Sequence, residues 1–255
     1  MRIDKKTMHA PELDRDVTLY VLLPKSYDDS VARYPVLYMQ DGHNLFYPED
    51  SYSGETWKVE ETFMEDSTLP EVIVVGIDSA KDERRLDEYC PVPFEAYRDN
   101  GGKGDVYLDY LLGTIKPHID DSYRSDPTDT AIMGSSMGGV ISLYAAIRHP
   151  SIFKRAASLS GAFYVAPKSL ASIVEAADFS ALKKLYMDTG DQEDGVAPKE
   201  EYLHSNGTIA AIISEKVSPI RFRYEIIPGG THEESAWAQR FAGIVRYIFK
   251  DDEER

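Results

Sequence analysis

The segment spanning residues 130–147 places one serine between an apolar run and a helical pattern. Residues 130–133 suit a short buried strand, and residues 134–139 read Gly-Ser-Ser-Met-Gly-Gly. Apolar side chains then recur at helical spacing, at Val140, Ile141, Tyr144 and Ile147. Ser136 therefore occupies a Gly-x-Ser-x-Gly frame at a strand-to-helix junction, which is typical of a nucleophile elbow. A glycine- and serine-rich turn between two buried elements is the alternative interpretation.

The residues around Ser136 suit the chemistry of such an elbow. Gly134 and Gly138 have no Cβ, so a strand and a helix can approach each other closely beside the serine. The backbone N–H of Met137 is expected at the N-terminus of the following helix, where it can bind a developing oxyanion. The rest of the chain must then supply a base, an acid and a second amide.

The base is predicted at His232. In sheets that carry this kind of elbow, the chain order is nucleophile, acid and then histidine. His232 directly follows the last predicted strand and precedes the last predicted helix. The other histidines precede the serine or lie in or at the end of predicted helices; they are His9, His43, His118, His149 and His204.

The acid is predicted in the acidic segment 188–195, which follows a predicted strand. In many such sheets a turn glycine precedes the acid by three residues, and this spacing from Gly190 selects Glu193. Asp194 is the alternative acid, and Asp191 is the third candidate.

A second oxyanion amide is predicted in residues 40–46, which follow the early strand at residues 36–39. Gly42 permits a turn there. The backbone N–H of His43 is the first choice and that of Asn44 the alternative. The direction of the backbone matters more than the identity of the side chain, because the amide itself binds the oxyanion.

Strand and helix patterns alternate along the chain. Strands are predicted at residues 17–23, 34–39, 71–77, 130–133, 156–159, 184–188 and 220–226, with an edge strand near residues 7–12. Further helices are predicted at residues 56–64, 105–119, 170–177, 200–216 and 235–249. This alternation predicts a mostly parallel sheet with helices on both faces, and the first two long strands are expected to form an antiparallel pair. We expect one domain over residues 1–255.

Two intervals, residues 42–56 and 78–104, are longer than simple connections and are interpreted as binding loops. Only residues 161–183 separate the strand after the elbow helix from the next strand, so no large cap domain is expected. Aromatic and cationic residues in or beside the two loops are the candidate substrate contacts: Trp57, Arg84, Arg85 and Tyr89.

The charge balance limits the partners of the chain. The sequence has 28 basic and 44 acidic residues, for a net charge of −16, which disfavours nucleic acid and anionic membranes as partners. The single cysteine, Cys90, excludes an internal disulfide framework. The acidic segment fails the EF-hand pattern, and His232-Glu233 lacks the second histidine of a zinc helix. We expect no metal and no cofactor, and the absence of a signal-peptide pattern predicts a cytoplasmic location.

Several short motifs occur in the order that characterises one enzyme family. They are residues 38–46 (Tyr-Met-Gln-Asp-Gly-His-Asn-Leu-Phe), Thr56-Trp57, Val75-Gly-Ile77, Arg84 with Glu88-Tyr89, residues 134–139, and Gly230-Thr-His232. Together they resemble the putative esterase (esterase D-like) family, which includes enterochelin esterases, feruloyl and acetyl xylan esterases and S-formylglutathione hydrolases.

The resemblance implies an α/β-hydrolase fold and a serine esterase, with Ser136 and His232 in its site. It gives the acid only as a position in residues 190–193, and some siderophore esterases of the family work with a serine–histidine dyad. The chain has Asp-Gly-His at residues 41–43 where S-formylglutathione hydrolases typically have His-Gly-Leu-Thr, which argues against that activity.

We therefore predict a serine carboxylesterase that hydrolyses a small acyl, aromatic acyl or siderophore-type ester through an acyl-enzyme. The expected partner is a small-molecule ester. An acyltransferase with the same serine is the first alternative, since an alcohol or a sugar could replace water as the acceptor. A catalytically silent binding module on the same fold is the second alternative.

Overall fold

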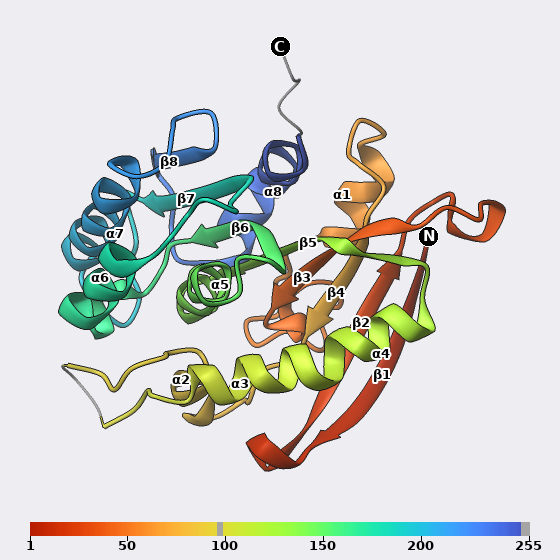
Figure 1. The fold of residues 1–255 in the computed structure, drawn as a ribbon, viewed down its shortest axis with the longest axis horizontal. Coiled ribbons are helices and arrows are strands. Elements are labelled where there is room, and N and C mark those ends of the chain that lie inside the picture. Colours follow the sequence, from red (N-terminus) through yellow and green to blue (C-terminus); the bar gives the residue numbers. More distant parts are fainter. Residues whose placement is uncertain (96–98, 251–255) are drawn as a thin grey trace.

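The structure of the chain, a computed structural model, describes residues 1–95 and 99–250. Its centre is an eight-stranded sheet in the order β1-β2-β4-β3-β5-β6-β7-β8 (Figure 1). The strands are β1 (Arg2–Ala10), β2 (Arg15–Leu23), β3 (Tyr34–Gln40), β4 (Ile73–Ile77), β5 (Ser125–Ser135), β6 (Phe153–Leu159), β7 (Lys184–Gly190) and β8 (Phe222–Ile227). Every strand that the sequence predicted is present, and the expected edge strand is β1.

The six strands from β3 to β8 run parallel to one another, whereas β1 and β2 are antiparallel to their neighbours. The sheet is therefore mostly parallel with an antiparallel N-terminal part, as predicted.

The predicted antiparallel pair of the strands at residues 17–23 and 34–39 is wrong, because β4 lies between them. Leu19 of β2 lies opposite Ile77 of β4, and β3 pairs with the other edge of β4. Every residue of β4 is buried. An apolar strand of this kind is stable only with a neighbour at each edge and cover on both faces, so β4 takes an interior position that chain order does not indicate.

Along the chain, each parallel strand is followed by one or more helices. They are α1 (Val59–Glu65), α2 (Arg84–Glu88), α3 (Gly104–Tyr110), α4 (Lys116–Ser122), α5 (Met137–Arg148), α6 (Pro167–Ala176), α7 (Lys199–Ser214) and α8 (Glu234–Phe249). A π-helical turn, Leu111–Ile115, joins α3 to α4, so the single helix predicted at residues 105–119 is one continuous helical segment. The sequence pattern did not predict α2, which lies inside the loop at residues 78–104.

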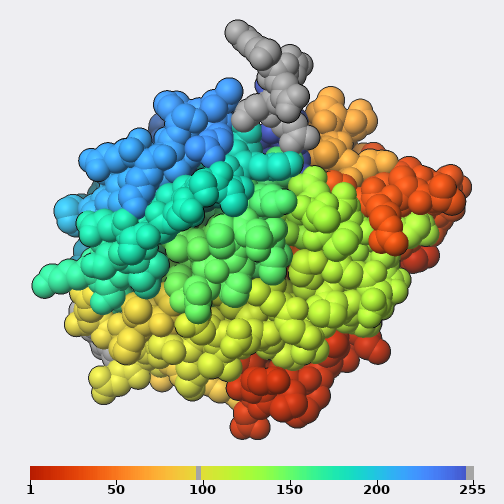
Figure 2. Space-filling model, in the orientation of Figure 1, coloured from red at the N-terminus to blue at the C-terminus, as the bar shows by residue number. Residues whose placement is uncertain are grey.

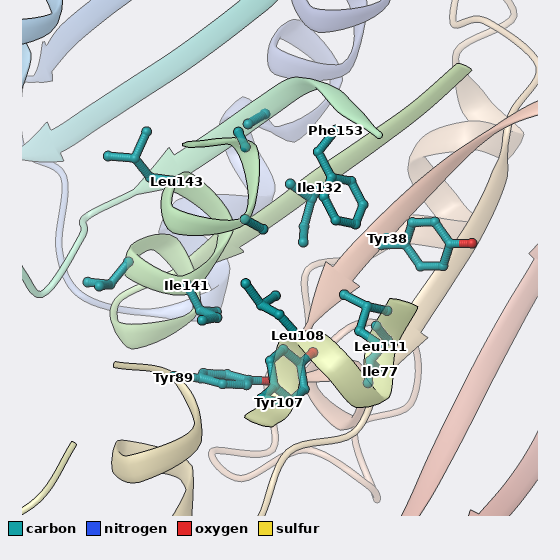
Figure 3. Packing of buried hydrophobic residues seen from close by; sticks show 14 of the residues in the cluster. Tyr38, Ile77, Tyr89, Tyr107, Leu108, Leu111, Ile132, Ile141, Leu143 and Phe153 are labelled. Atoms are coloured by element: carbon teal, nitrogen blue, oxygen red, sulfur yellow. The ribbon is translucent and has the colours of Figure 1, made fainter. Parts of the chain in front are cut away.

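The core has two layers, one on each face of the sheet. Val36 and Tyr38 of β3 pack with residues of α3, α4, α5, α6 and α7, whereas Leu37 and Met39 pack with residues of α1 and α8. Figure 3 shows Tyr38 in the first layer. Because both faces are covered there, the interior strands β3 and β4 are buried on both sides and read as nearly continuous hydrophobic runs.

The face of the sheet that carries the first layer is hidden from solvent. In the space-filling view, the segments that contain α4, α5 and α6, coloured from yellow-green to teal, lie side by side over it (Figure 2). Between β6 and β7 the chain forms only the 3-10 turn Phe163–Val165 and α6, so the predicted absence of a large cap is confirmed. None of the helices in the described ranges is long and apolar enough to cross a membrane.

Candidate active site

The predicted site residues all follow the carboxyl ends of parallel strands. Ser136 follows β5, Glu193 follows β7, His232 follows β8 and His43 follows β3. Because the carboxyl ends of parallel strands meet at one edge of a sheet, the fold brings these four residues to the same edge. This is the edge at which open α/β sheets bind ligands.

Ser136 lies in a sharp turn between β5 and α5. Its backbone has φ +56° and ψ −125°, a positive φ that costs a residue with a side chain about 1–3 kcal/mol. The turn is held because the N–H of Ser136 donates to the carbonyl of Leu159 at 2.9 Å, and its own carbonyl accepts from the N–H of Gly139 at 3.0 Å. The half-buried Ser136 lines a cavity at this edge of the sheet. The backbone geometry is that of the elbow that the sequence indicated.

Gly134 allows β5 and α5 to cross at close range. A Cβ at this position would lie 2.6 Å from the carbonyl carbon and the carbonyl oxygen of Gly138. A methyl group therefore cannot enter without moving the first turn of α5, and with it the backbone N–H of Met137.

We expect Gly134→Ala to lower the free energy of unfolding by about 1–3 kcal/mol, because the added methyl overpacks the elbow. Gly243→Ala is the matched control: a Cβ at Gly243, in α8, meets nothing within 4 Å, so alanine should raise stability by up to about 1 kcal/mol through helix propensity. Urea unfolding of both variants measures the difference. Equal stability of the Gly134→Ala variant and the wild type would show that the elbow tolerates a Cβ.

His232 and Glu193 form a close pair. The Nδ1 atom of His232 lies 2.6 Å from Oε2 of Glu193. The imidazole packs against the rings of Tyr202, at a centroid distance of 4.9 Å, and Trp237, at 5.1 Å. These contacts fix the ring plane. A proton on Nδ1 is donated to the carboxylate, which leaves Nε2 free to accept a proton.

Glu193 is fully buried, and its second oxygen is also engaged. Oε1 accepts a hydrogen bond from the N–H of Gly190 at 2.8 Å. Burial raises the pKa of Glu193, but its interactions with His232, Ser160 and the Gly190 amide lower the pKa by more than burial raises it. The pKa of Glu193 therefore lies below the ordinary value. The carboxylate is therefore ionised at neutral pH, when it can orient a histidine and stabilise its charged form.

The other acidic candidates in this segment lie elsewhere. Asp194 is exposed, and Asp191 accepts a hydrogen bond from the N–H of Gly229 at 2.7 Å, which ties together the turns after β7 and β8. Of the three acids considered from the sequence, Glu193 is thus the one whose carboxylate lies against the imidazole.

A buried polar cluster lies next to the acid, and no local sequence pattern predicts it. The carboxylate of Asp188, at the end of β7, binds the guanidinium of Arg240 at 2.6 and 3.0 Å. The buried hydroxyl of Ser160 accepts a hydrogen bond from Nε1 of Trp237 at 3.0 Å. Ser160 also has a positive φ, of +47°. The cluster connects β6 and β7 to α8, which begins two residues after His232.

The two expected oxyanion amides lie at the starts of helical turns. Met137 begins α5, so its N–H has no acceptor within the helix. His43 lies in the 3-10 turn Gly42–Asn44, which packs directly on β4, since a Cβ at Gly42 would lie 2.6 Å from the carbonyl carbon of Gly76. The buried imidazole of His43 is bound to Asp78, with 2.5 Å between Nδ1 and Oδ1.

The cavity beside Ser136 has a volume of about 160 Å³. Its lining combines Ser136, Met137 and Arg85 with the apolar or aromatic side chains of Leu86, Phe94, Tyr164, Val165 and Val196. The second predicted loop thus contributes to the wall through residues 85, 86 and 94, while its residues 96–98 lie outside the described ranges. No residue of the first loop, 42–56, is among the described lining residues of this cavity. The turn at residues 163–165 and Val196 also line the cavity, and no sequence pattern predicts either of them as a wall.

Three of the four candidate substrate contacts need correction. Trp57 is 3% exposed and packs against Trp237 and Phe241 in the core. Tyr89 is fully buried beneath Arg85, with the guanidinium carbon 5.1 Å from the ring centroid. Arg84 points to solvent and pairs with Asp82. Only Arg85 lines the cavity, because two neighbouring arginines in one helical turn face different directions.

No group of three or more His, Cys, Asp or Glu side chains within residues 1–95 and 99–250 could hold a metal ion.

The sheet order, the elbow between β5 and α5, and the histidine after β8 define an α/β-hydrolase fold. Residues 10–248 match the family that is described as Putative esterase. The chain belongs to this family, as its motifs indicated.

Individual relatives are distant but align along most of the chain. The uncharacterized protein YbbA of Bacillus subtilis (strain 168) is 26% identical over 249 residues, which cover 92% of this chain and 93% of YbbA. The structure of an IroE-like serine hydrolase from Shewanella oneidensis has a TM-score of 0.78 at 20% identity and covers 98% of this chain and 82% of its own. A ferulic acid esterase has a TM-score of 0.72 at 19% identity, with 97% and 98% covered. At these identities, the two structures show a shared fold.

Proposed function

We propose that the protein is a serine esterase that works through an acyl-enzyme, with Ser136, His232 and Glu193 as its triad. The observation that carries the proposal is the 2.6 Å contact between Nδ1 of His232 and the buried carboxylate of Glu193. The pair lies at the same sheet edge as the strained turn at Ser136. A buried carboxylate that orients an imidazole is the arrangement by which hydrolases activate a serine.

In the first half of the reaction, Oγ of Ser136 bonds to the ester carbonyl carbon while Nε2 of His232 takes the hydroxyl proton. The backbone N–H groups of Met137 and His43 bind the negative oxygen of the tetrahedral intermediate. When the intermediate collapses, the bond to the leaving oxygen breaks and His232 returns its proton to the alcohol. In the second half, water attacks the acyl-enzyme by the same sequence, which releases the acid and restores Ser136.

The cavity favours an acyl group with one ring and no charge. Its volume of about 160 Å³ is close to that of an apolar cavity of about 150 Å³ that holds benzene. Arg85, the one charged side chain among its described lining residues, is already paired with Asp41 through Nε and Nη2, at 2.7 Å each. An aromatic acyl group would therefore be buried without leaving a charge unpaired. The fold shared with a ferulic acid esterase of similar length agrees with this choice.

Two measurements test the proposal. A fluorophosphonate probe should label Ser136 of the wild-type protein, because only an activated serine reacts. The p-nitrophenyl esters of benzoate and dodecanoate release the same alcohol and differ only in the acyl group. We expect kcat/KM for the benzoate to exceed that for the dodecanoate by about tenfold or more, because a pocket that fits one ring excludes a long chain. Absence of labelling would reject the serine mechanism. Ester products in the presence of an added alcohol would indicate acyl transfer instead.

Val165→Phe provides a control for the acyl pocket. Val165 is a buried wall residue. A larger side chain there should lower kcat/KM for p-nitrophenyl benzoate, while kcat/KM for the smaller p-nitrophenyl acetate should stay nearly unchanged. Val196→Phe, at the exposed rim of the same cavity, should affect both esters little. Equal losses on both esters in Val165→Phe would show that the acyl group binds elsewhere.

A further inference from the structure

Asp41 occupies an unusual backbone position between β3 and the turn that contains His43. Its φ and ψ are +54° and +51°, a left-handed conformation that few residues with a side chain adopt. Its carbonyl accepts the N–H of Asn44 at 2.8 Å, and its own N–H donates to the hydroxyl of Tyr89 at 3.3 Å. The conformation of Asp41 therefore sets the direction in which the chain enters residues 42–44.

The buried side chain of Asp41 is held by two further residues. Oδ1 accepts hydrogen bonds from the hydroxyl of Ser79, at 2.6 Å, and from Nε of Arg85, at 2.7 Å. Oδ2 accepts from Nη2 of Arg85 at 2.7 Å. The arginine thus binds the carboxylate with two parallel hydrogen bonds, which fix orientation as well as distance.

Arg85 is itself held in place by its helix. Glu88, on the next turn of α2, binds the guanidinium of Arg15 from β2 at 2.7 to 3.2 Å, and both side chains of this pair are buried. The ring of Tyr89 lies under the Arg85 guanidinium. The α2 helix therefore cannot withdraw Arg85 from Asp41 without also breaking a buried ion pair.

The carboxylate lies close to the elbow. A Cβ built on Gly138 would be 3.2 Å from Oδ2 of Asp41, so the carboxylate packs against the first turn of α5, one residue after Met137. An unpaired negative charge at this point would oppose the negative charge that develops on the ester oxygen. Burial raises the pKa of Asp41, but the charge and the hydrogen bonds of Arg85 lower that pKa by more than burial raises it. The acid therefore stays ionised and paired.

We propose that Arg85 and Asp41 are a positioning pair for the oxyanion turn: Arg85 orients Asp41, and so the backbone of residues 41–43, and neutralises a carboxylate beside the elbow. The inference rests on the proposed esterase function and on the His43 amide as an oxyanion donor. It assigns Arg85 a role that does not depend on which acyl group binds.

Arg85→Met and Arg84→Met form a matched pair of variants, because the two arginines are adjacent in α2 and Arg84 pairs only at the surface. We expect Arg85→Met to lower kcat by about 10²-fold, the effect of losing one oxyanion-hole donor, with KM changed by less than about threefold. The loss should be the same for p-nitrophenyl acetate and p-nitrophenyl benzoate. Arg84→Met should keep the wild-type kcat.

The double variant Asp41→Asn with Arg85→Met separates charge from fold. If the unpaired carboxylate accounts for part of the loss, removing its charge should restore kcat at least about fivefold over Arg85→Met alone. A kcat of the double variant equal to or below that of Arg85→Met would overturn the neutralising role. A loss in Arg85→Met that appears in KM alone, or only with the benzoate, would overturn the positioning role, because it would identify Arg85 as a substrate contact.

Two controls keep the outcome clear. Circular dichroism and the thermal midpoint report whether Arg85→Met folds. If it does not fold, Arg85→Lys replaces it in the experiment. Lysine keeps the charge but loses the paired hydrogen bonds, so Arg85→Lys should lower kcat by about tenfold. A wild-type kcat in Arg85→Lys would then reject the orienting role. Wild-type protein that neither turns over an ester nor labels with fluorophosphonate would reject the esterase function itself, whereas an active wild type with an unaffected Arg85→Met rejects the pair alone.

Discussion

Ser136→Ala is expected to lower kcat for p-nitrophenyl acetate by roughly 10⁴-fold or more. The substitution removes the atom that bonds to the carbonyl carbon and leaves the rest of the site in place. Alanine keeps the Cβ of serine, so the positive φ at residue 136 is no more strained than before. The expected defect is therefore in kcat, while the stability of the variant should stay close to that of the wild type.

Ser158→Ala is the matched control for this experiment. Ser158 is a buried serine on the neighbouring strand β6, and its hydroxyl has no hydrogen-bond partner among the described residues. The same chemical change there should alter kcat by less than about threefold. Active-site titration with the fluorophosphonate probe should give no adduct with Ser136→Ala and a full adduct with Ser158→Ala. Turnover by Ser136→Ala near that of the wild type would reject the assignment of the nucleophile.

The residues at the elbow and at the last strand could be found from the sequence because each has a local signature. Ser136 lies between Gly134 and the pair Gly138-Gly139, where an apolar run changes to helical spacing. His232 lies between the last strand and the last helix. The parallel sheet then brings these two junctions to one edge, although they lie 96 positions apart in the chain. Chain order and strand polarity are enough for this step.

The choice among the acids depends on the path of two turns. The sequence spacing favours Glu193 but does not exclude Asp194, because both follow Gly190 closely. In the structure, a Cβ at Gly190 would lie 2.1 Å from the carbonyl oxygen of Gly230, so the turns after β7 and β8 touch backbone to backbone. That contact, which no local pattern shows, directs Glu193 toward His232 and leaves Asp194 in solvent.

The walls of the cavity could not be found in the same way. The sequence indicates Trp57 and Tyr89 as substrate contacts, because they are aromatic and lie in or beside long loops. Both are buried in the two core layers, where an aromatic ring has the same sequence signature as one that faces a ligand. The true wall includes Tyr164 and Val196, which come from segments that look like ordinary connections.

The predicted pairing of the strands at residues 17–23 and 34–39 was wrong for a related reason. Chain order makes the strands at residues 17–23 and 34–39 neighbours, yet β4 enters between them. Its five buried residues indicate an interior strand, but they do not indicate which two strands it separates. Such long-range choices depend on which faces are left to cover, and a single sequence does not display them.

Glu193→Gln and Asp194→Asn test the acid directly, because the two changes remove one charge each from adjacent residues. Glu193→Gln should lower kcat by roughly 10³- to 10⁴-fold, since an amide can donate to Nδ1 of His232 and so hold the proton on Nε2, where the base must be free. The exposed Asp194 does not contact the imidazole, so Asp194→Asn should change kcat by less than about threefold. A dyad mechanism would instead leave both variants near the wild-type rate.

The stability of the two variants should also differ with pH. The pKa of Glu193 lies below the ordinary value of 4.5 in the folded protein, so its ionisation stabilises the fold above that value. This contribution is lost as the pH falls from about 4.5 through the lower folded-state pKa. The urea midpoints of the wild type and of Asp194→Asn should therefore fall together as the pH is lowered from about 5 to about 3. The urea midpoint of Glu193→Gln should already be lower at pH 5 and should fall less over the same range. If all three proteins lost stability in parallel, the buried carboxylate would not be ionised, and it could not serve as the acid that supports His232.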